Sequence, residues 1–397
     1  MKNFSMKLTR FKTHKQNKIM TNPVDTAQLE KLRSEIDALD DKLAGLISER
    51  LTLVRRAAAL KSELKSAAYS QSREAFLQQH GAALEDKYEL PTDLMADLLK
   101  RIVRESYRTS GGKSFACVKS TERPLVIVGG QGGMGRLFLQ YFKASGYNAL
   151  SLDKDDWDRA PEILGRAMTV IISVPIDLTE EIIKKTAAFL PEDCLLCDFT
   201  SVKAPALNTM LEAWKGPVLG LHPMFGPDIR SMVKQVIVAC PGRDEGRGQF
   251  MLEQFRQWGA KVCECSAVEH DKAMSIIQAL RHFTTYCYGI FMAGIHPDLK
   301  QILDLSSPIY RLELEMVGRL FAQDPHLYCD IIMSSQQNIE LISDYAKSLQ
   351  QELEHISRCD KKTFVKHFLQ AREYFGDYAG MFLRESGALL AKVQDER

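Results

Sequence analysis

Three glycines in G-x-G-x-x-G spacing are the first residues of this chain whose pattern points to chemistry. Gly130, Gly132 and Gly135 directly follow the apolar run 125–128, and a helical pattern begins immediately after them. Asp153 lies 23 residues past Gly130, at the end of the next apolar run. In such a strand–turn–helix unit the glycines let the backbone approach a pyrophosphate at a helix N-terminus, and the acid binds a ribose hydroxyl. The expected cofactor site comprises Gly130, Gly132, Gly133, Met134, Gly135 and Asp153.

The acid also predicts which dinucleotide binds. A carboxylate at position 153 would repel a 2′-phosphate, so the pattern favours NAD over NADP. A strand–turn–helix without any ligand is the alternative, because glycine-rich turns are common. The strand, the helix and the acid in their expected places favour the cofactor site over that alternative.

Polar residues also follow two later strand-like runs. Ser201 and Lys203 come after the run 194–199, and His222 comes after the run 217–221. Ligands of doubly wound sheets bind at the carboxyl ends of the strands, so these three residues are candidates for a site. A helix N-cap for Ser201 and a turn histidine for His222 are the alternatives on position alone.

Four residues of the later helical segments complete the set of candidates. Gln278 and His282 are spaced i, i+4, which puts them on one face of a helix. Arg311 and Arg319 are eight residues apart. An arginine on a helix is usually a solvated charge, so spacing alone gives these two little weight.

A long predicted helix near the N-terminus carries charges in its apolar seam. Apolar residues alternate at spacings of three and four over 29–64, the pattern of one helix packed along a seam. Arg50 occupies a seam position, and a buried guanidinium needs an anion from a partner or a ligand. Lys61 lies only about 20° round the helix from Arg50, whereas Arg33 points about 100° away. On periodicity alone a structural coiled coil is favoured over a binding site.

The elements that must position these residues divide the chain into parts. Strand-like runs at 125–128, 148–152, 168–174, 194–199, 217–221 and 235–240, with helical patterns between several of them, predict a doubly wound α/β sheet. From about residue 271 only helical periodicity remains. Shorter helical segments are expected near 72–83 and 91–108. The expected parts are a disordered basic tail (1–22), an all-α domain (23–110), a linker (111–123), a Rossmann-type domain (124–265) and an all-α C-terminal domain (266–397).

Composition excludes several functions and partners. The net charge of +1 leaves no basic field for nucleic acid, and no run approaches the ~20 apolar residues of a membrane span. Nine scattered cysteines fit a reducing cytoplasm better than a disulfide framework. The pairs Cys194/Cys197 and Cys263/Cys265 lie in strand-like runs, where buried thiols are favoured over a metal site. The first 20 residues carry six cations and no acid, and a translation start at Met20 would remove them.

The segment LEKLRSEIDALDDKLAGLISERLTLVRR…LK…SREA…RIVRES resembles the all-helical chorismate mutase family. The resemblance implies three helices per chain, interlocked in a homodimer, and a pericyclic rearrangement of chorismate without proton transfer. It assigns Arg50 and Lys61 to one site, with Lys61 near the ether oxygen, and Arg33 to the site of the partner chain. Such cations would act by holding a compact conformer of the dianionic substrate and by stabilising developing charge.

The same resemblance gives roles to residues of the shorter helices. Glu74, with the adjacent Arg73 backbone, would bind the ring hydroxyl, and Ser106 would help to hold a carboxylate. Ser110 stands where related mutases often have Gln or Glu, which removes a second donor to the ether oxygen. Ser70 stands where some members carry an acid.

The segment 124–390 is similar to prephenate dehydrogenase in the motifs VIVGGQGGMGRLF, SVPI, SVK, GLHPMFGP, EHD, QALRHF and SSPIYRLELEMVGRLFAQDP. The resemblance implies that His222 takes the proton of the prephenate hydroxyl as hydride leaves for NAD, that Ser201 orients this pair, and that no metal takes part. Arg319 would clamp the ring carboxylate, since a planar fork suits a carboxylate. The other expected pocket residues are Lys203, Gln278, His282 and Arg311.

Nearly all of the chain from about residue 25 is thus similar to bifunctional mutase–dehydrogenases of bacterial tyrosine synthesis, in which tyrosine is an expected feedback inhibitor. Three alternatives stay open. The helical module could be a dimeriser without mutase activity, the dehydrogenase could be a β-hydroxyacid type, or the chain could be a regulator that senses NAD or tyrosine. The β-hydroxyacid reading gives no special role to Arg319, and the regulator reading predicts binding without turnover.

Overall fold

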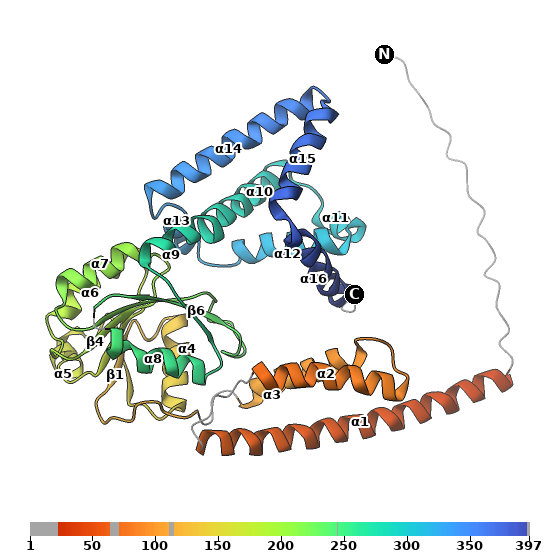
Figure 1. Cartoon of the computed structure of the whole chain (residues 1–397), viewed down its shortest axis with the longest axis horizontal. Helices are drawn as coiled ribbons and strands as arrows, with labels where there is room; N and C mark the ends of the chain where they lie inside the picture. The colour runs from red at the N-terminus through yellow and green to blue at the C-terminus, as the bar shows by residue number, and fades with distance from the viewer. Residues whose placement is uncertain (1–22, 64–70, 111–114, 244, 395–397) are drawn as a thin grey trace, which may run out of the picture.

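The computed structural model describes residues 23–63, 71–110, 115–243 and 245–394. Figure 1 shows an N-terminal group of helices, a central sheet flanked by helices and a C-terminal group of helices, in agreement with the predicted fold class. The predicted tail and the predicted departure at Ser70 lie outside the described residues. No helix within the described ranges is long and apolar enough to span a membrane.

The N-terminal group has a single long helix, as its periodicity predicts. It consists of α1 (Pro23–Glu63), α2 (Gln71–Tyr88) and α3 (Leu94–Ser110). Eight apolar side chains of the α1 seam, from Leu29 to Leu60, remain 45–64% exposed. Within the described residues of one chain, most of this seam is therefore uncovered. The helices α2 and α3 cross closely, because a Cβ on Gly81 would lie 2.8 Å from the Ala96 Cα atom.

The central sheet has seven strands in the order β2-β1-β3-β4-β5-β6-β7. All pairs are parallel except β5 with β6, which is antiparallel. The six predicted strands are present within two residues of their expected bounds, and β7 is an addition to them. The strands are β1 (Leu125–Val128), β2 (Ala149–Leu152), β3 (Thr169–Ile172), β4 (Leu195–Asp198), β5 (Val218–Pro223), β6 (Val236–Pro241) and β7 (Lys261–Glu264).

Helices cover both faces of this sheet, so successive residues of a strand enter different cores. Leu125 and Ile127 of β1 pack with the helices α4 and α8, whereas Val126 and Val128 pack with α5, α6 and α7. This two-sided burial explains why the strands read as continuous apolar runs. The helical elements are α4 (Gly133–Ala144), η1 (Trp157–Arg159), α5 (Ala160–Leu164), η2 (Ile176–Leu178), α6 (Thr179–Ala187), α7 (Ala204–Ala213) and α8 (Glu245–Gln257).

The C-terminal group begins with an irregular helical path. Ser266 caps α9 (Ala267–Met274) in a capping box with Glu269, a π-helical turn η3 (Ser275–Leu280) follows, and α10 (Arg281–Ile295) continues from it. Side-chain caps from Asp298, Ser307, Asp324, Ser335 and Asp360 start the next five helices. These are α11 (Leu299–Leu305), α12 (Pro308–Phe321), α13 (Pro325–Ile332), α14 (Gln336–Ser357) and α15 (Lys361–Phe375), and α16 (Asp377–Gln394) follows.

Candidate functional site

The glycine-rich turn between β1 and α4 has no room for side chains. A Cβ on Gly130 would lie 2.3 Å from the Ser151 hydroxyl, and one on Gly135 would lie 2.4 Å from the Gly129 carbonyl oxygen. The turn is thereby held against β2, and α4 begins at Gly133 with its N-terminus facing the turn. Backbone N–H groups at such a helix start bind phosphates well. The geometry fits the dinucleotide motif that the spacing predicts.

Asp153 lies directly beside this turn, one residue past the end of β2. Its Oδ1 accepts a hydrogen bond from the Gln131 backbone N–H at 3.1 Å, and its Oδ2 accepts one from the Ser151 hydroxyl. The carboxylate is therefore fixed next to the place where a ribose would lie. A Cβ on Gly133 would come within 2.9 Å of Pro227, so the loop after β5 also reaches the turn.

A pocket of about 260 Å³ opens beside that loop, between the carboxyl ends of β4 and β5 and the C-terminal helices. Five of the candidate residues line it although they come from four separate segments of the chain. The lining contains Ser201, His222, Gln278, His282 and Arg319, together with Arg281, Met316, Tyr328 and several apolar residues. The structure does not bring Lys203 or Arg311 to this lining.

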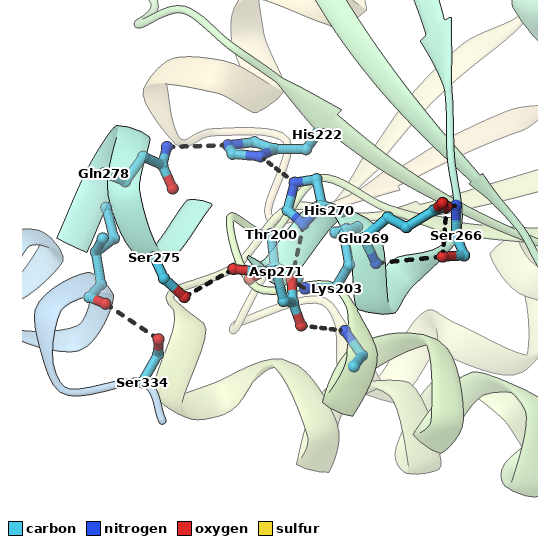
Figure 2. A network of polar contacts seen from close by, with 12 residues as sticks. Thr200, Lys203, His222, Ser266, Glu269, His270, Asp271, Ser275, Gln278 and Ser334 are labelled. Atoms are coloured by element: carbon cyan, nitrogen blue, oxygen red, sulfur yellow. Dashed lines mark hydrogen bonds and ion pairs between the residues drawn. The ribbon is translucent and has the colours of Figure 1, made fainter. Parts of the chain in front are cut away.

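His222 lies at the end of β5 and is held from both sides of its ring, as Figure 2 shows. Its Nδ1 is 2.8 Å from His270 Nε2, and its Nε2 is 3.4 Å from the Gln278 side-chain nitrogen. The side chain is 2% exposed. Burial, followed by the positive charge of Lys203 and by His270, lowers the pKa of His222 well below 6.5. The imidazole is therefore neutral at physiological pH and can accept a proton.

The chain of contacts continues from His270 to Asp271. His270 Nδ1 lies 2.7 Å from Asp271 Oδ1. The same carboxylate accepts the backbone N–H groups of Lys203 and Ala204, both at 2.8 Å, where α7 begins. Burial raises the pKa of Asp271, but the hydrogen bonds from His270 and from these two N–H groups lower it by more. Asp271 is therefore an anion that joins α9 to the end of β4.

The side chain of Lys203 does not point into the pocket, in contrast to its expected place there. It is fully buried and forms an ion pair with Asp198, which is also fully buried. Its Nζ donates a second hydrogen bond to the Leu221 carbonyl at 2.7 Å. Burial raises the pKa of Asp198, and Lys203 offsets part of that rise. A buried ammonium needs such partners, so it is directed inward, toward the backbone that precedes His222.

The two candidate arginines of α12 differ in their surroundings. Arg319 lines the pocket, is about half exposed, and binds Asp228 Oδ2 through Nη2 at 2.8 Å. This contact lowers the pKa of Asp228. Arg311 instead pairs with Glu315 one turn further along its own helix, at 3.0 Å. Its guanidinium is satisfied on the helix surface, which accounts for its place outside the pocket lining.

His282 lines the pocket and is half-buried. Its ring meets Tyr328 edge to face, with 4.9 Å between the ring centroids. Burial, with a smaller contribution from Arg281, lowers its pKa to about 4. Gln278 and His282 both line this pocket, although a π-helical turn contains the first of them.

The candidate residues of the helical domain are described only in part. Arg50 is half buried on α1, and Arg33 is exposed on the same helix. Ser106 is buried on α3, and its hydroxyl donates to the Ile102 carbonyl at 2.7 Å. Lys61 belongs to α1, Arg73 and Glu74 belong to α2, and Ser110 ends α3, but the side chains of these four lie outside the described residues.

Sequence reasoning assigned no role to His270, Asp271 or Asp228. His270 and Asp271 belong to the EHD motif, but adjacent residues at the start of a helix have no periodicity that would mark them. Asp228 lies in a loop, and its partner is 91 residues away. The proximity of each to a candidate residue comes from tertiary structure alone.

Comparison with known proteins gives matches over most of the chain. Family models match at residues 32–110 (chorismate mutase type II), 147–264 (prephenate dehydrogenase, nucleotide-binding domain) and 266–370 (prephenate dehydrogenase, dimerization domain). The T-protein of Enterobacter agglomerans is 48% identical over 371 residues, which cover 94% of this chain and 99% of that protein. The T-protein of Haemophilus influenzae is 45% identical over 367 residues, which cover 92% and 97%.

Among solved structures, the chain has the fold of a prephenate dehydrogenase from A. aeolicus in complex with hydroxyphenyl propionate and NAD+. The TM-score is 0.51 at 18% identity, and the match covers 64% of this chain and 98% of that one. At this identity the likeness shows a shared fold.

Proposed function

The chain belongs to the T-protein family, and from that premise we propose which of its residues act in each reaction. It is a bifunctional enzyme of tyrosine biosynthesis, with a chorismate mutase domain in front of a prephenate dehydrogenase. Chorismate is rearranged to prephenate, which is then oxidised and decarboxylated to 4-hydroxyphenylpyruvate with NAD.

His222 is the general base of the dehydrogenase in this proposal. The observation that carries it is a buried imidazole that lines the pocket and has a pKa lowered well below 6.5. A base must be neutral to accept the proton of the prephenate hydroxyl. Ser201 lines the same pocket and orients the hydroxyl against His222.

The proton is taken up and then returned. When bound, NAD would supply the acceptor for the hydride of the carbon that carries the hydroxyl. His222 Nε2 takes the hydroxyl proton, and the O–H electron pair completes a ring carbonyl. The bond to the ring carboxylate then breaks, carbon dioxide leaves, and its electron pair makes the ring aromatic. The phenolic oxygen recovers the proton from His222, so no proton is gained or lost overall.

Arg319 is the proposed clamp for the ring carboxylate. Its guanidinium lines the pocket and is held by Asp228 in the described structure, so that an anion already occupies one side of the fork. A substrate carboxylate would bind the remaining N–H groups or displace Asp228. Gln278 and His282 bound the rest of the pocket. The turn around Gly130 to Gly135 and Asp153 would hold the pyrophosphate and the ribose of NAD.

For the mutase we propose the roles that the family resemblance implies. Arg50 and Lys61 bind chorismate in one site, and Arg33 contributes to the site of a second chain. Glu74, with Arg73, binds the ring hydroxyl, and Ser106 holds a carboxylate once its hydroxyl turns away from Ile102. The uncovered seam of α1 and the dimerization domain that matches residues 266–370 support a homodimer.

We further propose a cytoplasmic location, supported by nine cysteines that fit a reducing compartment. We also propose the domain boundaries that the sequence predicts, and the start of α9 at Ala267 supports the one at residue 266. Tyrosine is proposed as a feedback inhibitor that competes with prephenate near His222. Inhibition that survives His222→Asn unchanged would contradict this shared site.

NADH formation, followed by absorbance, tests the proposal. Full-length protein is given NAD with either prephenate or chorismate. NADH should form from both substrates, and His222→Asn should abolish both signals while the disappearance of chorismate continues. NADH formation from prephenate alone would mean that the mutase domain is inactive, and Ser110 would be the first residue to test as the cause. Undiminished NADH formation by His222→Asn would remove His222 as the base.

A further inference from the structure

The side chains of His222, His270 and Asp271 form a continuous series of polar contacts, as Figure 2 shows. The His222 ring is joined to the His270 ring at 2.8 Å, and His270 is joined to Asp271 at 2.7 Å. His222 comes from β5, whereas the other two come from α9. Both imidazoles are at most 2% exposed, so water does not compete for these contacts.

Asp271 decides which atom of each ring carries a proton. Two backbone N–H groups already donate to its carboxylate, and its lowered pKa keeps it an anion that can only accept. His270 must therefore donate to it from Nδ1. A neutral imidazole has one N–H group, so His270 Nε2 keeps its lone pair and accepts from His222 Nδ1.

The proton position on His270 determines the protonation of His222 Nε2, the atom that faces the substrate. With its single proton on Nδ1, His222 has a lone pair on Nε2. That nitrogen faces the Nε2 amino group of Gln278, which can only donate to it. We propose that His270 and Asp271 are positioning residues of the dehydrogenase, which hold His222 in the one tautomer that can accept the substrate proton. This inference rests on the proposed role of His222 as the base.

The pair also stabilises the charged form of the base. When Nε2 accepts the hydroxyl proton, His222 becomes an imidazolium, and its Nδ1–H still donates to His270. Asp271 supplies the balancing negative charge through His270. The other charged groups near His222 are Lys203, Asp198, Arg281 and Arg319, three of them cations, so Asp271 is the anion aligned with this ring.

Asp271→Asn tests the tautomer directly. The amide can turn its NH₂ group toward His270, which moves the proton of His270 to Nε2 and forces His222 to carry its proton on Nε2. The base is then blocked although the shape is kept. The turnover number should fall by about 10³-fold or more, as it does when the aspartate of a Ser-His-Asp triad becomes asparagine. The affinity for NAD should remain within about twofold.

A matched pair at His270 separates the tautomer from packing. His270→Gln retains an amide oxygen that can accept from His222 Nδ1, and His270→Leu fills similar space without an acceptor. We expect His270→Gln to retain at least tenfold more activity than His270→Leu. His296→Asn is the control variant. His296 is exposed and ends α10 in the left-handed backbone conformation, which asparagine adopts readily. In ¹⁵N-histidine spectra, His222 Nε2 should be unprotonated in the wild type and protonated in Asp271→Asn.

The outcomes distinguish a failure of His222 as the base from a failure of His270 and Asp271 as positioning residues. If His222→Asn keeps its activity, the proposed base is wrong and the role of the pair fails with it. If His222→Asn is inactive but Asp271→Asn and His270→Leu lose less than about threefold, the base stands and the positioning role is overturned. Equal losses in His270→Gln and His270→Leu, together with weaker NAD binding, would show a purely structural role and would also overturn it.

Discussion

Replacing Lys203 with methionine should lower the thermal stability of the dehydrogenase part and leave the affinity for prephenate almost unchanged. The Lys203 and Asp198 side chains are both fully buried and paired with each other. Lys203→Met keeps the length of the side chain but leaves the Asp198 carboxylate alone in apolar surroundings. Breaking a buried pair in this way costs about 3–5 kcal/mol. For a part of this size that corresponds to a melting temperature lower by roughly 6–20 °C.

The assay is calorimetry of the full-length protein, which resolves separate unfolding transitions in a multidomain chain. The double variant Lys203→Met/Asp198→Asn has neither charge and keeps an acceptor for the Thr200 N–H, so it should recover more than half of the lost melting temperature. The exposed residue Lys215 gives the control, since Lys215→Met should shift the transition by less than about 1 °C.

Kinetics supply the refutation. Lys203 also donates to the carbonyl of Leu221, so its loss should lower turnover modestly by loosening the backbone before His222. The Michaelis constant for prephenate should stay within about threefold. A tenfold rise in that constant, with a melting temperature lowered by less than about 2 °C, would mean that Lys203 binds the substrate as the sequence predicted. The ion pair with Asp198 would then not be the main role of Lys203.

Three further predictions concern the base, the cofactor turn and the carboxylate clamp. Because burial lowers the pKa of His222 well below 6.5, kcat/KM for prephenate should be constant from about pH 8 down to 6.5 and should fall only at more acidic pH. If kcat/KM instead falls to half of its maximum at or above pH 6.5, His222 is not a buried, neutral base. Gly135→Ala would bring a Cβ to 2.4 Å from the Gly129 carbonyl oxygen, so the Kd for NAD measured by fluorescence should rise at least tenfold. Gly246→Ala is the control, because open space surrounds its Cβ and the Kd should not change. Equal NAD affinities of the two variants would mean that the turn does not need the small residue at position 135. Arg319→Lys should raise the Michaelis constant for prephenate by about 10–100-fold, since an ammonium lacks the fork, while chorismate consumption stays constant. An unchanged constant would mean that Arg319 does not clamp the ring carboxylate.

The cofactor turn could be predicted because its signal is local. Its glycines and Asp153 lie within 24 consecutive residues, and backbone sterics alone require the small residues. The strand bounds follow from equally local apolar runs. The antiparallel pairing of β5 with β6 has no such signal, because both strands are buried and read alike. Whether β6 pairs parallel or antiparallel with β5 depends on the path of the segment that connects them, which composition does not reveal.

Part of the pocket could be predicted from the rule that ligands of such sheets bind where a strand ends. Ser201 and His222 satisfy that rule, and both line the pocket. Lys203 satisfies it equally well but turns inward, because Asp198 at the end of β4 offers it a buried partner. The direction of a long side chain depends on such partners, which lie on other elements. His270 and Asp271 show the same limit, since their contacts are set by where α9 meets β5.

The π-helical turn between α9 and α10 contains one residue more than an α-helix of the same path needs. The residues before the turn and those after it are therefore offset in rotation about the helix axis. No single helix face with i, i+3, i+4 spacing extends from Ala267 to Ile295. Removing one residue from the turn would restore α-helical hydrogen bonds but rotate all that follows by about 100°. Arg281 and His282 would then leave the pocket. A regular α-helix in this segment is therefore incompatible with the present shape of the pocket. Selection for a more stable helix would remove Arg281 and His282 from the substrate site.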